Sequence, residues 1–433
     1  MFLQNRAVFG RFALILVLVG LAAILPASRR PPAQAAPALY SAKEFPPTAG
    51  PRIGPSTTKL LTCGASGNDY AEISSSTAVS LRACHLKVPA SGQLFVSANG
   101  SAGYQDAYTR ALFQIVLNDG QMKATDRYIS VFSDTGDGSD ASVALSGLFP
   151  VPPGDYTIEL VGQRESGTGT MRVYDPALSV LFIPGTGIDI LTCRDMDPTM
   201  YITTSGEYQV MRSCTLNLPS DGWAFISADA TAWGLSTPFE AAFDIGIDSI
   251  VGTSDATRWV DAYQATGRGV DRTVAMTMLK PVTAGRHSFN FLARRHAGTS
   301  DIRVASPALS VIYIPATSPH VASCNVLDST LWETSSGDFA VVRQCSIKLP
   351  EDSVAFMAAD ANLGISNGTF EAHLRLGIDS TDGFDGTDRY TNVYADSHDG
   401  TDDSAALSVL KPVTAGSHTF YFLGRSMRGI GTT

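Results

Sequence analysis

The sequence predicts an all-β protein built of three tandem jelly-roll-like β-sandwich domains, the third of which lacks its last strand. Three observations predict this architecture. One unit recurs along the chain at a fixed period, each copy is a series of short apolar runs separated by turn residues, and each copy contains one pair of cysteines.

The repeat is clearest at residues 279–315, which read LKPVTAGRHSFNFLARRHAGTSDIRVASPALSVIYIP, and at residues 148–184, which carry nearly the same text. One glycine recurs at intervals of 131 residues, as Gly154, Gly285 and Gly416. This period is close to the commonest size of a self-contained domain and far above the 20 to 50 residues of solenoid repeats. We therefore expect three domains, at residues 58–186, 187–317 and 318–433.

Residues 1–35 are predicted to be a secretory signal peptide. Two arginines precede an apolar run at residues 12–27, and Ala33-Gln34-Ala35 offers the small residues that signal peptidase accepts. The run is short for a membrane span of about 20 residues. Arg29 and Arg30 follow it, which leaves an uncleaved membrane anchor as the alternative. On either interpretation we expect the remaining chain to be secreted or extracellular, and residues 36–57, rich in proline, to be an extended linker.

The charge of the chain excludes one class of partner. The formal net charge is −10, and residues 1–35 contain four arginines and no acidic residue, so the remainder carries −14. Such a chain has no basic patch to displace counterions from phosphates. We therefore expect no nucleic-acid partner.

Short apolar or alternating runs fill the first copy, with turn sequences such as Asn118-Asp119-Gly120 and Pro153-Gly154 between them. The predicted strands are 60–63, 84–88, 94–98, 111–117, 128–132, 143–149, 156–161, 171–173 and 178–183. About nine strands and no helical pattern are typical of a β-sandwich or jelly roll.

The cysteines carry the most specific signal. In each copy the second cysteine follows the first by 21 residues, which predicts the disulfides Cys63–Cys84, Cys193–Cys214 and Cys324–Cys345. Each should stabilise its domain by about 3 kcal/mol in the chain-entropy model. No CxxC motif or histidine pair accompanies them, as a zinc site would require. An arginine lies two residues before each second cysteine, namely Arg82, Arg212 and Arg343. Each should flank its disulfide and could pair with a carboxylate at the sheet margin.

Two acidic turns are candidate calcium sites, because alternating carboxylates around a glycine gather the oxygens that calcium binds. The candidate ligands are Asp134, Asp137 and Asp140 in the first copy and Asp396, Asp399 and Asp402 in the third. The second copy has Ala265 and Arg268 at the first two of these positions, and the spacing differs from that of an EF-hand loop. Calcium is the only cofactor that we consider. The alternative is a plain turn, because acidic hairpin turns also occur with no metal.

No nucleophile elbow, zinc-protease motif or phosphate-binding loop is present, so we expect no enzyme. Two polar positions recur in all three copies. One is an asparagine or aspartate, at Asn118, Asp248 and Asp379. The other is an arginine followed by an aromatic residue, at Arg127-Tyr128, Arg258-Trp259 and Arg389-Tyr390. Together these types could line a sugar-binding cleft. The structural alternative, which we favour, is a turn residue, an ion pair and a core ring.

Each copy resembles the C1q and TNF-like jelly rolls over most of its length, in domain length, all-β character and the layout of its C-terminal part. The resemblance rests on a turn of the form L-x-aG-x-h at residues 279–287 and 410–418, a following strand with alternating aromatics, and a closing strand at residues 309–314. It implies ten-stranded jelly rolls that assemble as trimers and bind ligands through their outer surface. Three such domains in one chain could form an intramolecular pseudo-trimer, with beads on a string as the alternative.

The third copy breaks off at Gly431-Thr432-Thr433, which matches Gly298-Thr299-Ser300 in the second. It therefore lacks the closing strand and should leave a neighbouring strand edge unpaired. An incomplete sequence is one explanation. Donation of the strand by another chain is the other.

The sequence thus predicts a secreted or cell-surface, non-catalytic structural or adhesive protein whose partner is an unknown extracellular protein or glycan. The alternative is a carbohydrate-binding protein, which would need exposed, coplanar aromatic rings among Trp233, Trp259, Trp332 and Tyr104. A hydrolase ranks third and would need two carboxylates about 5 to 10 Å apart in one cleft.

Overall fold

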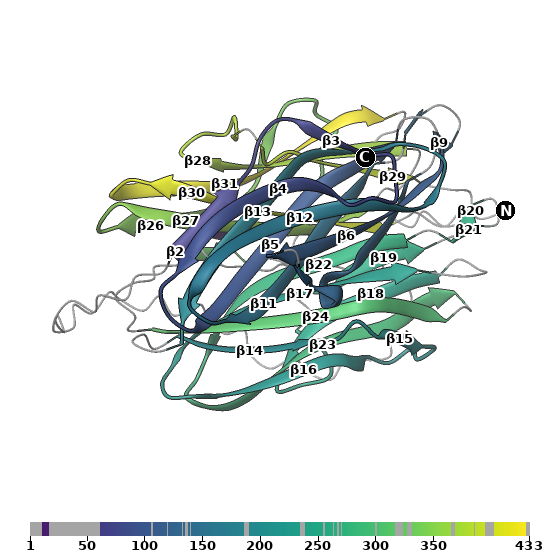
Figure 1. The fold of residues 1–433 in the computed structure, drawn as a ribbon. Coiled ribbons are helices and arrows are strands. Elements are labelled where there is room, and N and C mark those ends of the chain that lie inside the picture. The colour runs from purple at the N-terminus through teal and green to yellow at the C-terminus, as the bar shows by residue number, and fades with distance from the viewer. Residues whose placement is uncertain are drawn as a thin grey trace.

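The computed structural model describes two parts of the chain, residues 11–16 and 61–429. Within the second part it leaves out residues 105–106, 119, 132, 135–136, 139, 186–189, 234–238, 254–255, 263, 266–267, 270, 299–300, 317–323, 327–330, 365–368, 385 and 395–401. Figure 1 shows three groups of strands packed side by side, one for each repeat. No helix in these described parts is long and apolar enough to cross a membrane.

Repeat 2 shows the plan most completely. Its inner sheet has the order β14 (Leu191–Met196), β24 (Ile302–Pro315), β17 (Gly222–Trp233) and β22 (Asp271–Val282), and β15 (Met200–Thr203) also pairs with β24. Its outer sheet has the order β16 (Gln209–Leu218), β23 (Gly285–Gly298), β18 (Phe239–Ile247) and β19 (Arg258–Ala262). The chain passes between an antiparallel five-stranded inner sheet and an antiparallel four-stranded outer sheet in the manner of a jelly roll, as the sequence predicted.

Repeat 1 has the same plan. Its inner sheet is β11 (Ala141–Val151), β5 (Gly92–Tyr104), β13 (Met171–Pro184) and β2 (Leu61–Ala65), with β3 (Tyr70–Ile73) also on β13. Its outer sheet is β4 (Val79–Val88), β12 (Gly154–Gly167), β6 (Thr109–Leu117) and β7 (Gly120–Gln121), with β8 (Arg127–Val131) on β6. Two short hairpins extend repeats 1 and 2, namely β9 (Ser133–Asp134) with β10 (Asp137–Gly138), and β20 (Gln264–Ala265) with β21 (Arg268–Gly269).

In repeat 3 the outer sheet is β26 (Ala340–Leu349), β31 (Gly416–Gly429), β28 (Thr369–Ile378) and β29 (Arg389–Tyr394). Its inner sheet is β25 (Cys324–Val326), β1 (Arg11–Leu16), β27 (Ser353–Gly364) and β30 (Asp402–Val413). β1 therefore stands where β13 and β24 close the first two repeats. It belongs to the segment predicted to be a signal peptide, and the neighbouring strand edge that we expected to be unpaired is partly covered.

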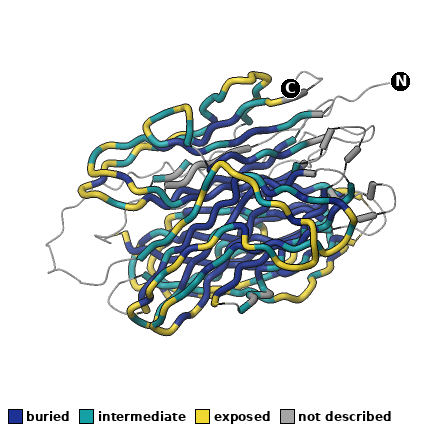
Figure 2. The backbone as a smooth tube through the Cα atoms, turned by 45° about the horizontal axis from the view of Figure 1, so that its top comes forward, coloured by how far each residue is buried: buried dark blue, intermediate teal, exposed yellow. Residues whose placement is uncertain are grey.

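The two sheets of a repeat differ in burial. The outer-sheet strand β16 alternates between exposed and buried residues, so one of its faces meets water. The inner-sheet strand β17 is buried at almost every position, so both of its faces are covered. One face packs on the core of its own repeat, and the other faces the neighbouring repeats. Figure 2 shows the resulting concentration of buried chain toward the middle of the molecule.

The strand prediction for repeat 1 divided one strand wrongly and missed four short strands, β3, β7, β9 and β10. Residues 171–173 and 178–183, predicted as separate strands, form the single strand β13, because the interruption at Asp175 and Pro176 is a bulge rather than a turn. Asp175 has a φ of 47°, a conformation that breaks the local pattern without ending the strand. Of the missed strands, β3 is an edge strand of four residues whose sequence, YAEI, is too short to give an alternating signal.

Candidate functional site

An aromatic cluster joins the three repeats. Phe95, Phe225 and Phe356 come from the central inner-sheet strands β5, β17 and β27, and all three are buried. The ring centroids are 5.3 Å apart for Phe95–Phe225, 5.8 Å for Phe95–Phe356 and 6.1 Å for Phe225–Phe356, each in an edge-to-face geometry. Such pairs contribute about 0.5 to 1.5 kcal/mol beyond the area that they bury. One residue of each repeat therefore meets the other two at a single point.

Arg127 links repeat 1 to repeat 2. Its guanidinium is fully buried, and its Nε donates a hydrogen bond of 2.8 Å to Oδ1 of Asp229, whose carboxylate also accepts from the terminal nitrogen Nη2. Nη1 donates to the backbone carbonyl of Ser306 at 2.9 Å. Ser146 donates to the other carboxylate oxygen of Asp229 from its backbone N–H and from its hydroxyl. Burial raises the pKa of the Asp229 carboxyl, whereas Arg127 and Ser146 act in the opposite direction.

The other two repeat boundaries use the same positions. Arg258 of repeat 2 pairs with Asp360 of repeat 3, and Arg389 of repeat 3 donates to the side-chain oxygen of Asn99 in repeat 1. Asp360 also accepts from the backbone and hydroxyl of Thr277. The contacts therefore run from repeat 1 to 2, from 2 to 3 and from 3 back to 1, which makes a closed cycle.

The residue after each arginine extends this cycle through its backbone N–H. Tyr128 donates to the hydroxyl of Thr231 at 2.9 Å, Trp259 to the side-chain oxygen of Asn362 at 2.7 Å and Tyr390 to the hydroxyl of Ser101 at 2.7 Å. Each bond crosses a repeat boundary. The backbone of the strand that carries the arginine is thus fixed to the inner sheet of the next repeat.

The recurrent arginines therefore do not line a sugar-binding cleft. They are structural, as we favoured, but their partners lie in neighbouring repeats rather than across a strand. The recurrent turn position is separate from them: Asn118, Asp248 and Asp379 have φ values of 46°, 54° and 56°. The side-chain oxygen of each accepts a hydrogen bond from a backbone N–H of the adjacent strand; Asp248, for example, accepts from Ser288 at 2.7 Å.

The residues that accept hydrogen bonds from the three recurrent arginines were not identified from the sequence. Asn99, Asp229 and Asp360 recur at the same place in each copy, which was the available signal. Their pairing with arginines was not visible, because each arginine reaches a different repeat about 100 residues or more away in the chain.

A second group of charge pairs lies across the boundaries, with buried carboxylates and with Arg110 half-buried. Arg110 of repeat 1 pairs with Asp271 of repeat 2 at 2.8 Å, and Ser130 donates to the same carboxylate. Arg272 approaches the carboxylate of Asp403 in repeat 3 to 3.6 Å. Burial raises the pKa of Asp403 to about 6, although Arg272 opposes the shift.

We expect Asp403 to make the stability of the protein fall as the pH rises from about 4 to about 6. The unfolded carboxyl ionises near pH 4, whereas the folded one keeps its proton to about pH 6, so the folded state binds more protons in this window. The largest effect of such a shift is about 3 kcal/mol. Melting temperatures measured from pH 4 to 7 for the wild type and Asp403→Asn test this. The wild type should lose stability relative to the variant, and parallel curves would contradict the prediction.

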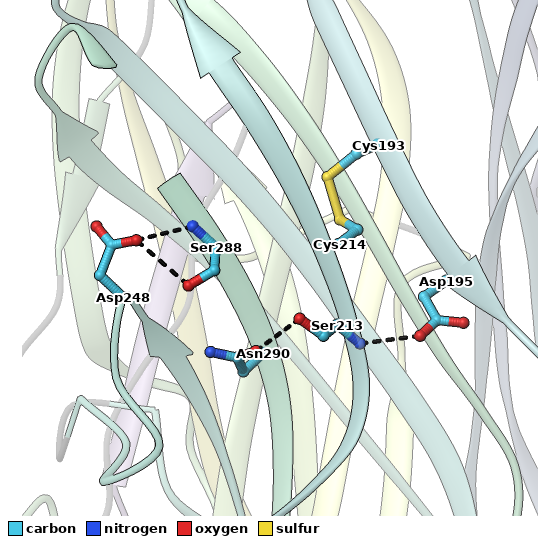
Figure 3. The surroundings of a disulfide bond; sticks show 7 residues. All are labelled: Cys193, Asp195, Ser213, Cys214, Asp248, Ser288 and Asn290. Carbon is cyan, nitrogen blue, oxygen red and sulfur yellow. Dashed lines mark hydrogen bonds between the residues drawn. A yellow bond between two sulfur atoms is a disulfide. The ribbon is translucent and has the colours of Figure 1, made fainter. Parts of the chain in front are cut away.

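The predicted disulfides are present, as Cys63–Cys84, Cys193–Cys214 and Cys324–Cys345. In repeat 2 the bond joins β14 to β16, edge strands of opposite sheets, and Figure 3 shows its surroundings. Ser213 donates from its backbone to Asp195 at 2.9 Å and from its hydroxyl to Asn290 at 2.8 Å. Each repeat is thus stapled between its sheets, which is typical of a protein that folds in an oxidising compartment.

Arg82 and Arg212, which flank the first two disulfides, lie beside carboxylates as predicted. Arg82 pairs with Asp69, and Arg212 approaches Asp197 to 3.6 Å. Asp69 and Asp197 are largely exposed, so each pair contributes little to stability. Arg343 donates to the backbone carbonyl of Val342 at 2.7 Å.

The candidate calcium ligands fall mostly outside the described side chains. Asp396 and Asp399 lie outside the described residues, and of Asp134, Asp137 and Asp402 only the backbone strand positions are described. Asp140 is half-buried, and its backbone carbonyl accepts from Asn392 of repeat 3 at 3.0 Å. Within the described parts of the chain, no group of three or more histidine, cysteine, aspartate or glutamate side chains is placed to hold a metal ion.

The aromatic residues proposed for a carbohydrate site are not exposed where the structure describes them. Trp259 is buried, and Trp233 and Trp332 are half-buried. The side chain of Tyr104 lies outside the description. An exposed aromatic ring is found instead at Tyr70 on β3, which is 52% exposed.

The comparisons with known proteins find low similarity between this chain and solved structures. No family model and no curated protein matches the chain. The VP2 subviral particle of infectious bursal disease virus matches at 10% identity over 87% of this chain and 82% of that chain, with a TM-score of 0.22. The tandem CBM22-1–CBM22-2 domains of Paenibacillus barcinonensis Xyn10C match at 8% identity over 60% and 94%, with a TM-score of 0.14. Scores this low carry no argument.

The class of the protein therefore follows from its own sheet topology. It is an all-β chain of three jelly-roll-like β-sandwiches, each with an inter-sheet disulfide. The resemblance to C1q and TNF-like domains stays a prediction.

Proposed function

We propose that this protein is a secreted or cell-surface, non-catalytic structural or adhesive protein, and that its three repeats act together as an intramolecular pseudo-trimer. The observation that supports this most is the placement of the recurrent charged residues. Arg127, Arg258 and Arg389 are fully buried at the repeat boundaries, where they hold neighbouring repeats together. The disulfides support an oxidising environment.

On this proposal the recurrent arginines serve to join the repeats and do not bind a partner. The described outer strands, such as β4 and β16, present an alternating, partly exposed face, which is the surface left for a partner. A rigid body of three fused sandwiches presents three copies of such a face in fixed relative positions. Multivalent contact with a repetitive extracellular protein surface would gain affinity from this arrangement.

A bead-adhesion experiment tests the proposal. Beads coated with the folded protein should adhere to a layer of extracellular matrix protein or to cells. Beads coated with the reduced and alkylated protein, in which the sandwiches are no longer stapled, should not adhere. Equal adhesion of both bead types, or no adhesion by either, would contradict an adhesive role.

The carbohydrate-binding alternative rests on Tyr70. Its ring lies 6.1 Å from that of Tyr174, and the guanidinium of Arg172 lies 4.5 Å from its centroid. An exposed ring beside a polar group is a platform on which a sugar could stack. If this alternative holds, bead adhesion should be inhibited by a free sugar and Tyr70→Ala should abolish binding on a glycan array. The matched control is Tyr156→Ala, a half-buried tyrosine on β12, which should leave array binding unchanged.

A further inference from the structure

The closing strands of repeats 1 and 2 share a bulge but differ in its first residue. β13 reads Asp-Pro-Ala-Leu-Ser-Val at residues 175–180, and β24 reads Ser-Pro-Ala-Leu-Ser-Val at residues 306–311. In both repeats the register with the central strand shifts here, and the first residue has a positive φ, 47° for Asp175 and 48° for Ser306. A residue other than glycine is strained in this conformation, and such strain concentrates at sites that do chemistry. Repeat 1 therefore holds a strained aspartyl–prolyl bond where repeat 2 has a seryl–prolyl bond.

The side chain of Asp175 is in reach of its own peptide bond by covalent structure alone. Attack of a carboxyl oxygen on the carbonyl carbon of the same residue closes a five-membered ring, and intramolecular reactions of this kind are strongly favoured by proximity. Aspartate carboxylates act as nucleophiles in other proteins in the same way. The nitrogen of Pro176, which would be the leaving group, has no N–H and so takes no part in the strand ladder.

A buried cation is directed at the carbonyl oxygen of this bond. Nη1 of Arg389 donates to the carbonyl oxygen of Asp175 at 3.0 Å, and the guanidinium is fully buried. A donor in this position stabilises the negative charge that develops on the oxygen when the carbonyl carbon is attacked. Repeat 2 has the same donor without the carboxyl, because Nη1 of Arg127 donates to the carbonyl oxygen of Ser306 at 2.9 Å.

The carboxyl of Asp175 keeps its proton in mildly acidic solution. Asp175 is 8% exposed, and burial raises the pKa of its carboxyl to about 6, with the neighbouring carboxylate of Asp388 acting in the same direction. Asp69 also raises this pKa, whereas Arg389 and Arg375 lower it. A protonated carboxyl beside the bond is a source of the proton that the leaving nitrogen needs.

The sequence contains a second aspartyl–prolyl bond, Asp197-Pro198, which lacks this environment. Its carbonyl oxygen also accepts from an arginine, Nη2 of Arg212 at 3.3 Å. Its carboxylate, however, accepts a hydrogen bond of 2.8 Å from the backbone N–H of Thr199, and this bond lowers the pKa of the Asp197 carboxyl. In mildly acidic solution Asp197 is therefore ionised and has no proton for the leaving nitrogen.

We propose that Asp175 cleaves the peptide bond between itself and Pro176. The carboxyl oxygen attacks the carbonyl carbon of Asp175, and the carboxyl proton passes to the nitrogen of Pro176. The bond between this carbon and the nitrogen then breaks, which leaves a cyclic anhydride on Asp175 and a secondary amine on Pro176. Solvent water opens the anhydride, restores the side-chain carboxyl and creates a new C-terminal carboxyl. Arg389 stabilises the oxyanion of the first step. Each chain reacts once, and the reaction does not depend on the proposed function.

No disulfide joins the two products. Cys63–Cys84 lies before the bond, and the other two disulfides lie after it. The residues of β13 on both sides of the bond are paired with β5, so the products stay together in the folded protein. They separate only under denaturing conditions, where no reductant is needed.

Incubation of the purified chain from pH 5 to 8, followed by denaturing electrophoresis and mass spectrometry, tests the proposal. One product should end at Asp175 and the other should begin at Pro176. The rate should increase as the pH falls through about 6, because the protonated carboxyl is the reactive form. In the folded protein this bond should break at least about tenfold faster than Asp197-Pro198, because the carboxyl, its proton and the oxyanion donor are brought together at Asp175 alone.

Two controls separate the action of the fold from the general acid sensitivity of such bonds. In urea both aspartyl–prolyl bonds should break slowly and at similar rates, because neither has a folded environment. The variant Asp175→Ser copies the bulge of repeat 2, so it should fold and should not be cleaved after residue 175. Absence of the product that ends at Asp175, equal rates at the two bonds in the folded protein, cleavage in urea as fast as in the folded protein, or cleavage of Asp175→Ser at this bond would each overturn the proposal.

Discussion

Replacing Arg127 with methionine should destabilise the protein by about 3 to 5 kcal/mol, because it leaves the carboxylate of Asp229 buried without its counter-charge. Asp229 is 1% exposed, so water cannot replace the guanidinium. The double variant Arg127→Met/Asp229→Leu should regain most of the loss, since an apolar pair of similar volume no longer buries a charge. Urea denaturation measures both effects as a shift in the midpoint.

The matched control is Arg82→Met. Arg82 also pairs with an aspartate, but Asp69 is 63% exposed, so the loss should be below about 1 kcal/mol. If Arg127→Met cost no more than this control, the contact between repeats 1 and 2 would not form in solution.

Replacing Phe225 with alanine should also cost about 3 to 5 kcal/mol, because it empties a site filled by a fully buried ring. The cost alone does not show that repeats touch, since any core phenylalanine gives a similar value. The informative quantity is the coupling with Phe356→Ala in a double-mutant cycle. Residues in contact couple by about 0.5 to 3 kcal/mol, whereas distant ones add.

Phe291 supplies the control for this cycle. It lies fully buried in the core of repeat 2 and belongs to a different cluster from Phe356. Phe291→Ala and Phe356→Ala should therefore add within about 0.5 kcal/mol. Equal coupling of Phe356 to Phe225 and to Phe291 would show that the aromatic contact between repeats is absent.

The sequence predicted the architecture because the relevant signals are local or periodic. The 21-residue spacing of the cysteines recurs in each copy, and the disulfides follow it. The strands of the outer sheets alternate in polarity because one of their faces meets water. Strand β13 was divided wrongly, since the bulge at Asp175-Pro176 has the residue types of a turn and only pairing with β5 keeps it in the sheet.

The contacts between repeats could not be derived in the same way. Arg127 and its aspartate are 102 residues apart, and a buried ion pair has no local pattern that distinguishes it from an exposed one. The inner strands offered an indirect signal. Their polar residues, such as Asp229 and Thr231 in β17, lie on a strand that is otherwise apolar on both faces. Polar side chains on such a strand require partners from outside their own sandwich.

Small-angle X-ray scattering of the full-length chain tests the closed cycle of repeats most directly. A compact particle of this length should have a radius of gyration of about 22 Å. Three separate sandwiches in line should instead give about 33 Å when each is treated as a compact 131-residue domain. We predict a value near the first, increased slightly by the N-terminal segment. A value near the second would contradict the packing of the three repeats around Phe95, Phe225 and Phe356.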